Sequence, residues 1–143
     1  MNPVEASRDY SSVWNNDAKG TGHARSMLDS DQAWSAGTNT KGEWMQIDLG
    51  STMCVNGVVT QRRKSIYQRV TSYKLSYSAD GSSFTELSKV FSANVANDES
   101  RVTNSFEAVQ ARYVRFIVQT WDHHISMRAG IIASDIPEEP GIF

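Results

Sequence analysis

The sequence has a single cysteine, Cys54, among its 143 residues, together with only three prolines. One cysteine excludes an internal disulfide, so packing of ordinary apolar side chains has to stabilise the chain. A chain of this length can bury a sizeable core as one domain. No apolar run approaches the roughly 20 residues of a membrane-spanning helix. The first ten residues, MNPVEASRDY, also lack an apolar signal core, so we expect either a chain made without a classical signal or a module from a longer protein.

The sequence also lacks an excess of charge of either sign. A net charge of −2 provides no general attraction to nucleic acid or to an anionic membrane, so any electrostatic preference has to be local. Hydrophobic residues make up 39% and charged residues 21%, which is typical of an ordinary folded domain.

The motifs of common catalytic sites are absent as well. There is no G-x-S-x-G, H-E-x-x-H, phosphate-binding loop or dinucleotide fingerprint. Of the three histidines, His123 and His124 are adjacent, and neighbours on an extended backbone point opposite ways, so we do not expect them to share a metal ion. Cys54 lies in an apolar run and is predicted to be an inert core thiol. These features predict a protein that is not an enzyme.

Instead of helical stripes, the sequence contains short alternating runs. Met45, Ile47 and Leu49 alternate with polar residues, and so do Val114, Phe116 and Val118. This period predicts strands with one buried face. Many such runs separated by turn residues predict an all-β sandwich or barrel. We expect Trp34 and Trp44 in its core.

The segments between these runs predict the domain boundaries. We expect residues 1–10 to be a loosely held leader and residues 134–143, which are acidic and contain proline, to be a linker-like tail, leaving a domain at 11–133. Residues 11–24 are rich in Asn, Gly and Ser and are predicted to form a long exposed loop. Residues 24–29 are predicted to form one helical turn.

Three motifs in order carry a resemblance to a known family: W-x-Q-I-D-L-G, a strand ending T-Q-x-R, and V-T-S-Y-K-L-x-Y-S-x-D-G. Together they resemble the discoidin domain family, also called the coagulation factor V/VIII type C family, which is close to the family 32 carbohydrate-binding modules. The resemblance covers roughly residues 5–133. It implies an eight-stranded jelly roll of the discoidin and galactose-binding-domain class, and an extracellular or cell-surface role.

The resemblance also implies a sugar site. A pyranose is held by directed donors on its hydroxyls and by an aromatic ring against its C–H face, and the fork of an arginine supplies such donors. In family 32 modules the loop after the T-Q-x-R-like strand carries the arginine that grips galactose, and Arg63 takes that place. Arg62 stands where a relative has glycine. Ser35 stands where these modules often have histidine.

Partners for Arg63 are expected from loops at the same end of the barrel. Tyr67 shares its loop, and Trp121 and His123 come from the penultimate loop, where sugar-binding relatives often place an aromatic residue. Arg128 lies in the last predicted strand, and we expect it to pair with an acid such as Asp48. The resulting prediction is a lectin-like module for galactose or N-acetylgalactosamine, active in cell or matrix adhesion, with oligomer formation left open.

Two other binding roles stay open. Clotting-factor members of the family expose apolar loop tips ringed by basic residues, and here Trp14 and the Ile66-Tyr67 pair are surrounded by Lys19, Arg62, Arg63, Lys64 and Arg69. Such loops would suit an anionic phospholipid. A protein receptor is the third alternative. Trp14 itself is either a stacking platform or a plug that closes one end of the barrel.

Many relatives hold a structural calcium ion with an acidic D-G-x-x-x-T loop and a glutamate in the last strand. Here the loop is Asp29-Ser30-Asp31-Gln32-Ala33, without the threonine, and Gly130 falls near the place of the glutamate. Calcium prefers six to eight oxygen ligands. Asp29 and Asp31 are therefore only weak candidates, and we expect no bound metal.

Overall fold

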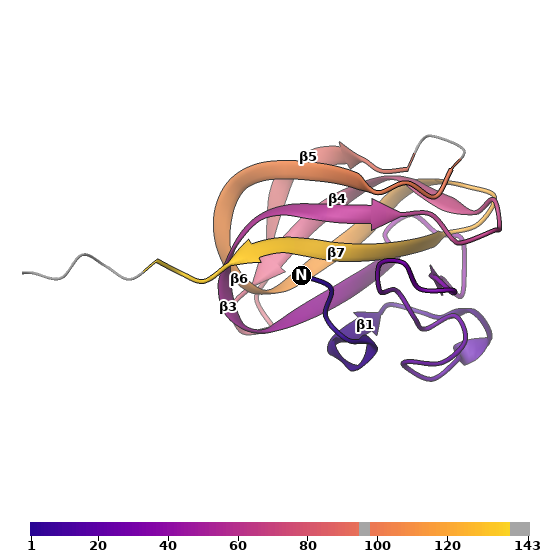
Figure 1. Cartoon of the computed structure of the whole chain (residues 1–143), viewed down its shortest axis with the longest axis horizontal. Helices are drawn as coiled ribbons and strands as arrows, with labels where there is room; N and C mark the ends of the chain where they lie inside the picture. The colour runs from indigo at the N-terminus through magenta and orange to yellow at the C-terminus, as the bar shows by residue number, and fades with distance from the viewer. Residues whose placement is uncertain (95–97, 138–143) are drawn as a thin grey trace, which may run out of the picture.

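The computed structural model describes residues 1–94 and 98–137 (Figure 1). Its secondary structure consists of two short 3-10 helices and seven strands: η1 (Glu5–Ser7), β1 (Arg8–Tyr10), η2 (Trp14–Asn16), β2 (Trp34–Ser35), β3 (Trp44–Gln61), β4 (Arg69–Ser78), β5 (Thr85–Ser92), β6 (Val102–Asp122) and β7 (Ser126–Ser134). Every strand pair in this part of the chain is antiparallel. The predicted all-β fold of the discoidin class is confirmed.

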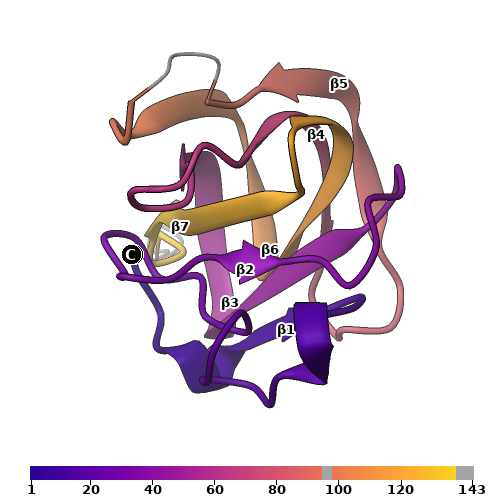
Figure 2. The ribbon, with the colours of Figure 1, turned by 90° about the vertical axis from the view of Figure 1, so that its right-hand side faces the viewer.

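Two long strands, β3 and β6, wrap the sheet around the core. The strand order is β2-β7-β3-β6-β4-β5, with β1 added on β3. β3 changes direction near Gly50, where φ is 85° and the register with β6 shifts, so its first half pairs with β1 and its second half with β7. The sheet therefore folds into two facing layers, as the end-on view in Figure 2 shows. The described residues form seven strands rather than the expected eight. β6 is longer than the predicted run around Phe116 and includes Trp121, which was expected in the penultimate loop.

The alternating runs bury the residues that were expected in the core. Met45, Ile47, Val114, Phe116 and Val118 are all buried, and Trp34 is fully enclosed. Tyr73 stacks on Phe91 with ring centroids 5.7 Å apart.

Two core predictions were wrong. Trp44 is only half-buried and lies on the outer face, with the Arg115 guanidinium 4.0 Å from its ring centroid. Cys54 is half-buried rather than enclosed. Both residues stand on faces of β3 that the core does not cover.

The first ten residues, which we expected to be loosely held, are part of the sheet. β1 pairs with β3, and the Arg8 side chain is completely buried. Its guanidinium donates to the carbonyls of Pro3, Ser26 and Ala129, so it joins the N-terminal segment to β7. Residues 24–29 form no helical turn, contrary to expectation, because their backbone amides donate instead to side chains such as Glu5.

The predicted ion pair between Arg128 and Asp48 was also wrong. Asp48 accepts from Arg112 across the sheet, at 2.8 and 3.0 Å. Arg128 is almost fully buried and instead donates to Glu99 and to two backbone carbonyls. Residues 90–99, VFSANVANDE, are polar and are predicted from the sequence to form a loop. Residues 90–92 instead end strand β5, and residues 95–97 lie outside the described residues. The same holds for residues 138–143 of the predicted tail.

The two ends of the barrel differ. In Figure 1 the β3–β4 loop and the β6–β7 turn lie at the right-hand end, whereas β7 runs to the left-hand end and leaves residues 135–137 there. The loop-bearing end faces the viewer in Figure 2. Among the described residues, we find no helix with the length and apolarity needed to cross a membrane.

Candidate functional site

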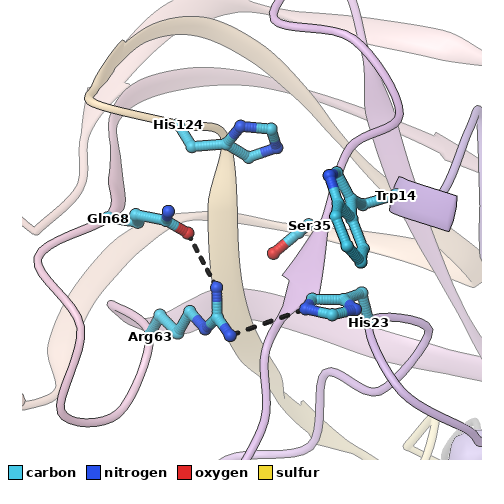
Figure 3. A pocket seen from close by; sticks show the side chains of 6 residues that line it. All are labelled: Trp14, His23, Ser35, Arg63, Gln68 and His124. Carbon is cyan, nitrogen blue, oxygen red and sulfur yellow. Dashed lines mark hydrogen bonds between the residues drawn. The ribbon is translucent and has the colours of Figure 1, made fainter.

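A pocket of about 290 Å³ opens at the loop-bearing end of the barrel. Four segments that are distant in sequence form it: the 11–24 loop, β2, the β3–β4 loop and the β6–β7 turn. Figure 3 shows the six side chains that line it: Trp14, His23, Ser35, Arg63, Gln68 and His124.

The β3–β4 loop is held in a tight conformation that places Arg63 over the pocket. The amide of Arg63 donates to the Gln68 carbonyl at 3.2 Å, and Ser65 adopts a φ of 61° at the tip. At the base of the loop, Nε of the buried Arg128 donates to the Arg62 carbonyl at 2.9 Å. Because these contacts fix the backbone on both sides of Arg63, its side chain starts from a rigid position.

The guanidinium of Arg63 lies among neutral partners. Nη1 donates to Gln68 Oε1 at 3.0 Å, and Nη2 lies 3.5 Å from His23 Nε2 (Figure 3). No carboxylate within the described ranges forms an ion pair with it. Partial burial lowers the pKa of Arg63, which remains a cation because a guanidinium does not lose its proton in proteins.

A chain of hydrogen bonds then fixes the polarity of the pocket floor. Because a guanidinium only donates, Gln68 presents Oε1 to Arg63, and the same oxygen accepts from Ser126 Oγ at 3.0 Å. The Ser126 proton is thus committed, so Ser35 donates in the 2.8 Å contact between the two hydroxyls. β2 brings this about by pairing Ser35 with Ser126. Ser35 Oγ therefore acts toward a ligand as an acceptor, through its lone pairs.

The two histidines have defined tautomers. His23 Nδ1 donates to the Asp17 carboxylate at 2.9 Å, so Nε2 is left as the acceptor that faces Arg63. The hydrogen bonds from the amide and ring of His23 hold the pKa of Asp17 below its usual value. His124 Nε2 donates to the Ala36 carbonyl at 2.9 Å, and Nδ1 accepts from Asn39. His124 therefore contributes mainly ring carbons to the pocket.

Trp14 supplies the aromatic wall. It begins η2 and is 48% exposed, with its ring packed edge-on against His23 at a centroid distance of 4.7 Å. An exposed indole beside a polar floor gives the pocket one apolar side.

Of the six binding residues proposed from the sequence, the structure brings Arg63 and Trp14 together in the pocket. Arg62, Tyr67 and His123 lie beside it: His123 packs edge-on against Tyr67 at 4.9 Å, and Arg62 donates to the carbonyls of Asp98 and Ile66. Trp121 belongs to β6 and packs against the core, so it does not line the pocket.

Four lining residues were not proposed from the sequence: His23, Ser35, Gln68 and His124. Gln68 shares a loop with Arg63, and Ser35 follows the first core tryptophan, so position was a usable signal for these two. His124 lines the pocket in place of its neighbour His123, because His123 takes a left-handed backbone with a φ of 63°. No sequence signal predicted that His23 would reach Arg63.

At the position where many relatives hold calcium, the acidic side chains bond to other residues of this chain. The Asp29 carboxylate bonds with Arg101 and Gln61, and Asp31 pairs with Lys64 at 2.7 Å. A side chain at Gly130 would meet Leu28 Cδ1 at 2.5 Å, so a glutamate has no room there. The described part of the chain contains no cluster of three or more His, Cys, Asp or Glu that could hold a metal.

We therefore expect the thermal unfolding midpoint to be the same, within about 1 °C, in millimolar calcium and in excess EDTA, because a ligand that does not bind the native state adds no stability. Differential scanning fluorimetry measures this. A midpoint that rises steadily with calcium concentration would contradict it.

The fold and pocket together define a class: a jelly-roll binding module with a polar pocket and an exposed tryptophan at one end. The chain belongs to the F5/8 type C domain family, whose model matches residues 4–131. Domains of this family are typically non-catalytic binding modules.

Lactadherin of Bos taurus is 38% identical over 110 residues, which cover 70% of this chain and 26% of lactadherin. The chain thus spans about a quarter of the length of that relative. Discoidin II of Dictyostelium discoideum superposes with a TM-score of 0.71 at 25% identity, over 91% of this chain and 55% of that chain. A family 32 carbohydrate-binding module of Clostridium perfringens, solved with GalNAc-β-1,3-galactose, has the same fold, with a TM-score of 0.65 at 17% identity over 90% of each chain.

Proposed function

We propose that this domain is a non-catalytic carbohydrate-binding module that holds a terminal galactose or N-acetylgalactosamine in the Arg63 pocket. The observation that carries the proposal is that Arg63 and Trp14 line the same pocket, although 49 positions separate them in the sequence. A guanidinium donates to neighbouring hydroxyls of a pyranose, and an indole ring covers its apolar C–H face.

The size and polarity of the pocket support a single sugar ring. Its volume of about 290 Å³ lies at the lower end of small-molecule sites. Arg63 and Gln68 offer donors, Ser35 offers an acceptor, and Trp14 and His124 offer ring surface. The sugar-bound module from Clostridium perfringens supports the same kind of ligand on this fold.

One such pocket, open to solvent, is expected to bind a single sugar weakly. Useful attachment to a cell surface or matrix would then need several copies, because linked sites raise the effective concentration of one another. We propose adhesion through multivalent display, either within a longer chain or in an oligomer.

A glycan array tests the proposal. We expect signal on glycans that end in galactose or N-acetylgalactosamine, and we expect free galactose to compete for it. Trp14→Ala should weaken that binding by about two- to tenfold, since an aromatic contact is worth roughly 0.5–1.5 kcal/mol. An array without any glycan signal would overturn the proposal.

Exposed apolar side chains at the rim favour a second candidate, binding to an anionic membrane. Trp14 and Ile66 are 48% and 42% exposed, and Arg62 and Lys64 stand near Ile66. Sedimentation with phosphatidylserine vesicles separates the two functions: in the membrane case, Trp14→Ala abolishes sedimentation, and free galactose has no effect. A domain that binds neither glycans nor vesicles would leave a protein receptor as its partner.

A further inference from the structure

The pocket offers more hydrogen-bond donors than acceptors. A guanidinium carries five N–H groups, and Arg63 uses two of them, on Gln68 and His23, which leaves three. Gln68 turns its oxygen to Arg63 and Ser126, so both N–H groups of its amide remain for a ligand. Ser35 contributes the lone pairs of its hydroxyl oxygen, while the ring nitrogens of His124 are engaged with Ala36 and Asn39. A ligand rich in acceptors therefore fits this pocket better than one that has to donate.

The charges around the pocket also favour a ligand that is rich in acceptors. The segment from Arg62 to Arg69 contains four basic residues and no acid. Lys64 and Arg69 pair with Asp31 and Asp122, whereas Arg63 has no ion pair with a carboxylate within residues 1–94 and 98–137. Asp17, which lies beyond His23, already accepts from the amide and ring of His23 and from Asn15. Arg63 is thus a partly desolvated cation that forms no ion pair with a described carboxylate, and burial lowers its pKa.

We propose that the pocket prefers a carboxylated sugar, such as a uronic acid, over the uncharged sugar of the same configuration. This inference rests on the proposed function, because it assumes that a sugar ring occupies the pocket. A carboxylate brings only acceptors and presents two oxygens to the fork of Arg63, which gives a bidentate, charge-assisted contact. An ammonium-bearing amino sugar brings donors and a like charge, so the pocket discriminates against it.

The concave form of the site favours a sugar acid over a lipid headgroup as the source of that charge. The six lining side chains border a volume suited to one ring, and the partly buried Arg63 is one of them. The cations that extend from the surface, such as Lys64, are the ones that a membrane would meet.

Calorimetry with three methyl glycosides, of galactose, galacturonic acid and galactosamine, tests the proposal at low and at high salt. We expect the acid to bind about tenfold more tightly than galactose at low salt, and the ratio to shrink as salt rises. The galactosamine glycoside should bind more weakly than galactose. In parallel, sedimentation with phosphatidylserine vesicles tests whether the domain binds an anionic lipid headgroup.

Two variants sharpen the test. Gln68→Glu keeps an oxygen acceptor for Arg63 and adds the missing counter-charge, so the preference for the acid should disappear or reverse. The quantity compared is the ratio of the affinity for the acid to the affinity for galactose. A variant that weakens the binding of both sugars equally leaves this ratio unchanged. Lys64→Gln removes an equal charge from the outer rim and should leave the ratio within about twofold of the parent value.

The possible outcomes distinguish the two proposals. If galactose binds but the acid binds no more than about twofold better, the present inference is overturned and the proposed function stands. Retention of the full acid preference in Gln68→Glu also overturns the inference. Binding of vesicles without binding of any sugar overturns both proposals.

Discussion

Replacing Arg63 by methionine is expected to weaken sugar binding by about 100-fold or more. Each hydrogen bond from a charged donor contributes about 1.5–3 kcal/mol, and Arg63 is placed to make two of them to one sugar. Methionine keeps much of the aliphatic packing, so the loss reports on the guanidinium itself. Isothermal titration with galactose, or with the acid if it binds more tightly, measures the effect.

Lys19→Met is the matched control for this variant. Lys19 is a surface cation that pairs with Asp9, and it does not line the pocket. Lys19→Met should leave the affinity for the sugar within about twofold of the parent value. The thermal midpoint of Arg63→Met should also stay close to that of the parent, because Arg63 is only partly buried. Equal losses of affinity in Arg63→Met and Lys19→Met would show that the overall charge of the domain surface, rather than the Arg63 contact, holds the ligand.

Replacing Arg8 by methionine is expected to lower the free energy of unfolding by roughly 3 kcal/mol or more. Arg8 is completely buried, and its removal leaves the carbonyls of Pro3, Ser26 and Ala129 without their donor. An orphaned buried acceptor costs about 1–3 kcal/mol. For a domain of this size, the thermal midpoint should fall by roughly 10 °C. Urea unfolding followed by tryptophan fluorescence measures the change in stability.

Arg112→Met provides the comparison. Arg112 forms a bidentate pair with Asp48, but both side chains remain partly exposed, so this variant should shift the midpoint only slightly. A shift for Arg8→Met no larger than that for Arg112→Met would show that water replaces the lost donors. The N-terminal ten residues would then contribute little to stability.

The strand pattern and the position of Arg63 were predictable because both depend on residues that lie close together in the sequence. Whether Met45 and Phe116 point inward depends on the alternation of side chains along a strand, which a short window reveals. Arg63 followed from its spacing to two recognisable strands. Arg8 was missed because its burial depends on three carbonyls from distant segments, and no local pattern encodes them.

The composition of the pocket depended on contacts between distant segments. His23 reaches Arg63 because the 11–24 loop folds back over the end of the barrel, and Ser35 becomes an acceptor only because β2 pairs with β7. Trp121 and His123 were reasonable choices on residue type. The extension of β6 to Asp122 directs the first toward the core, and a left-handed residue places the second beside Tyr67.

The sequence by itself therefore determined the all-β class, the family and the arginine at the centre of the candidate site, since each is encoded by the order of nearby residues. The tertiary structure alone decided which side chains share the pocket, which of their atoms donate, and that Arg63 has no acidic partner among the described residues. Those properties depend on distances between segments more than a hundred positions apart in the sequence, such as those of Trp14 and His124, and only the folded chain fixes such distances.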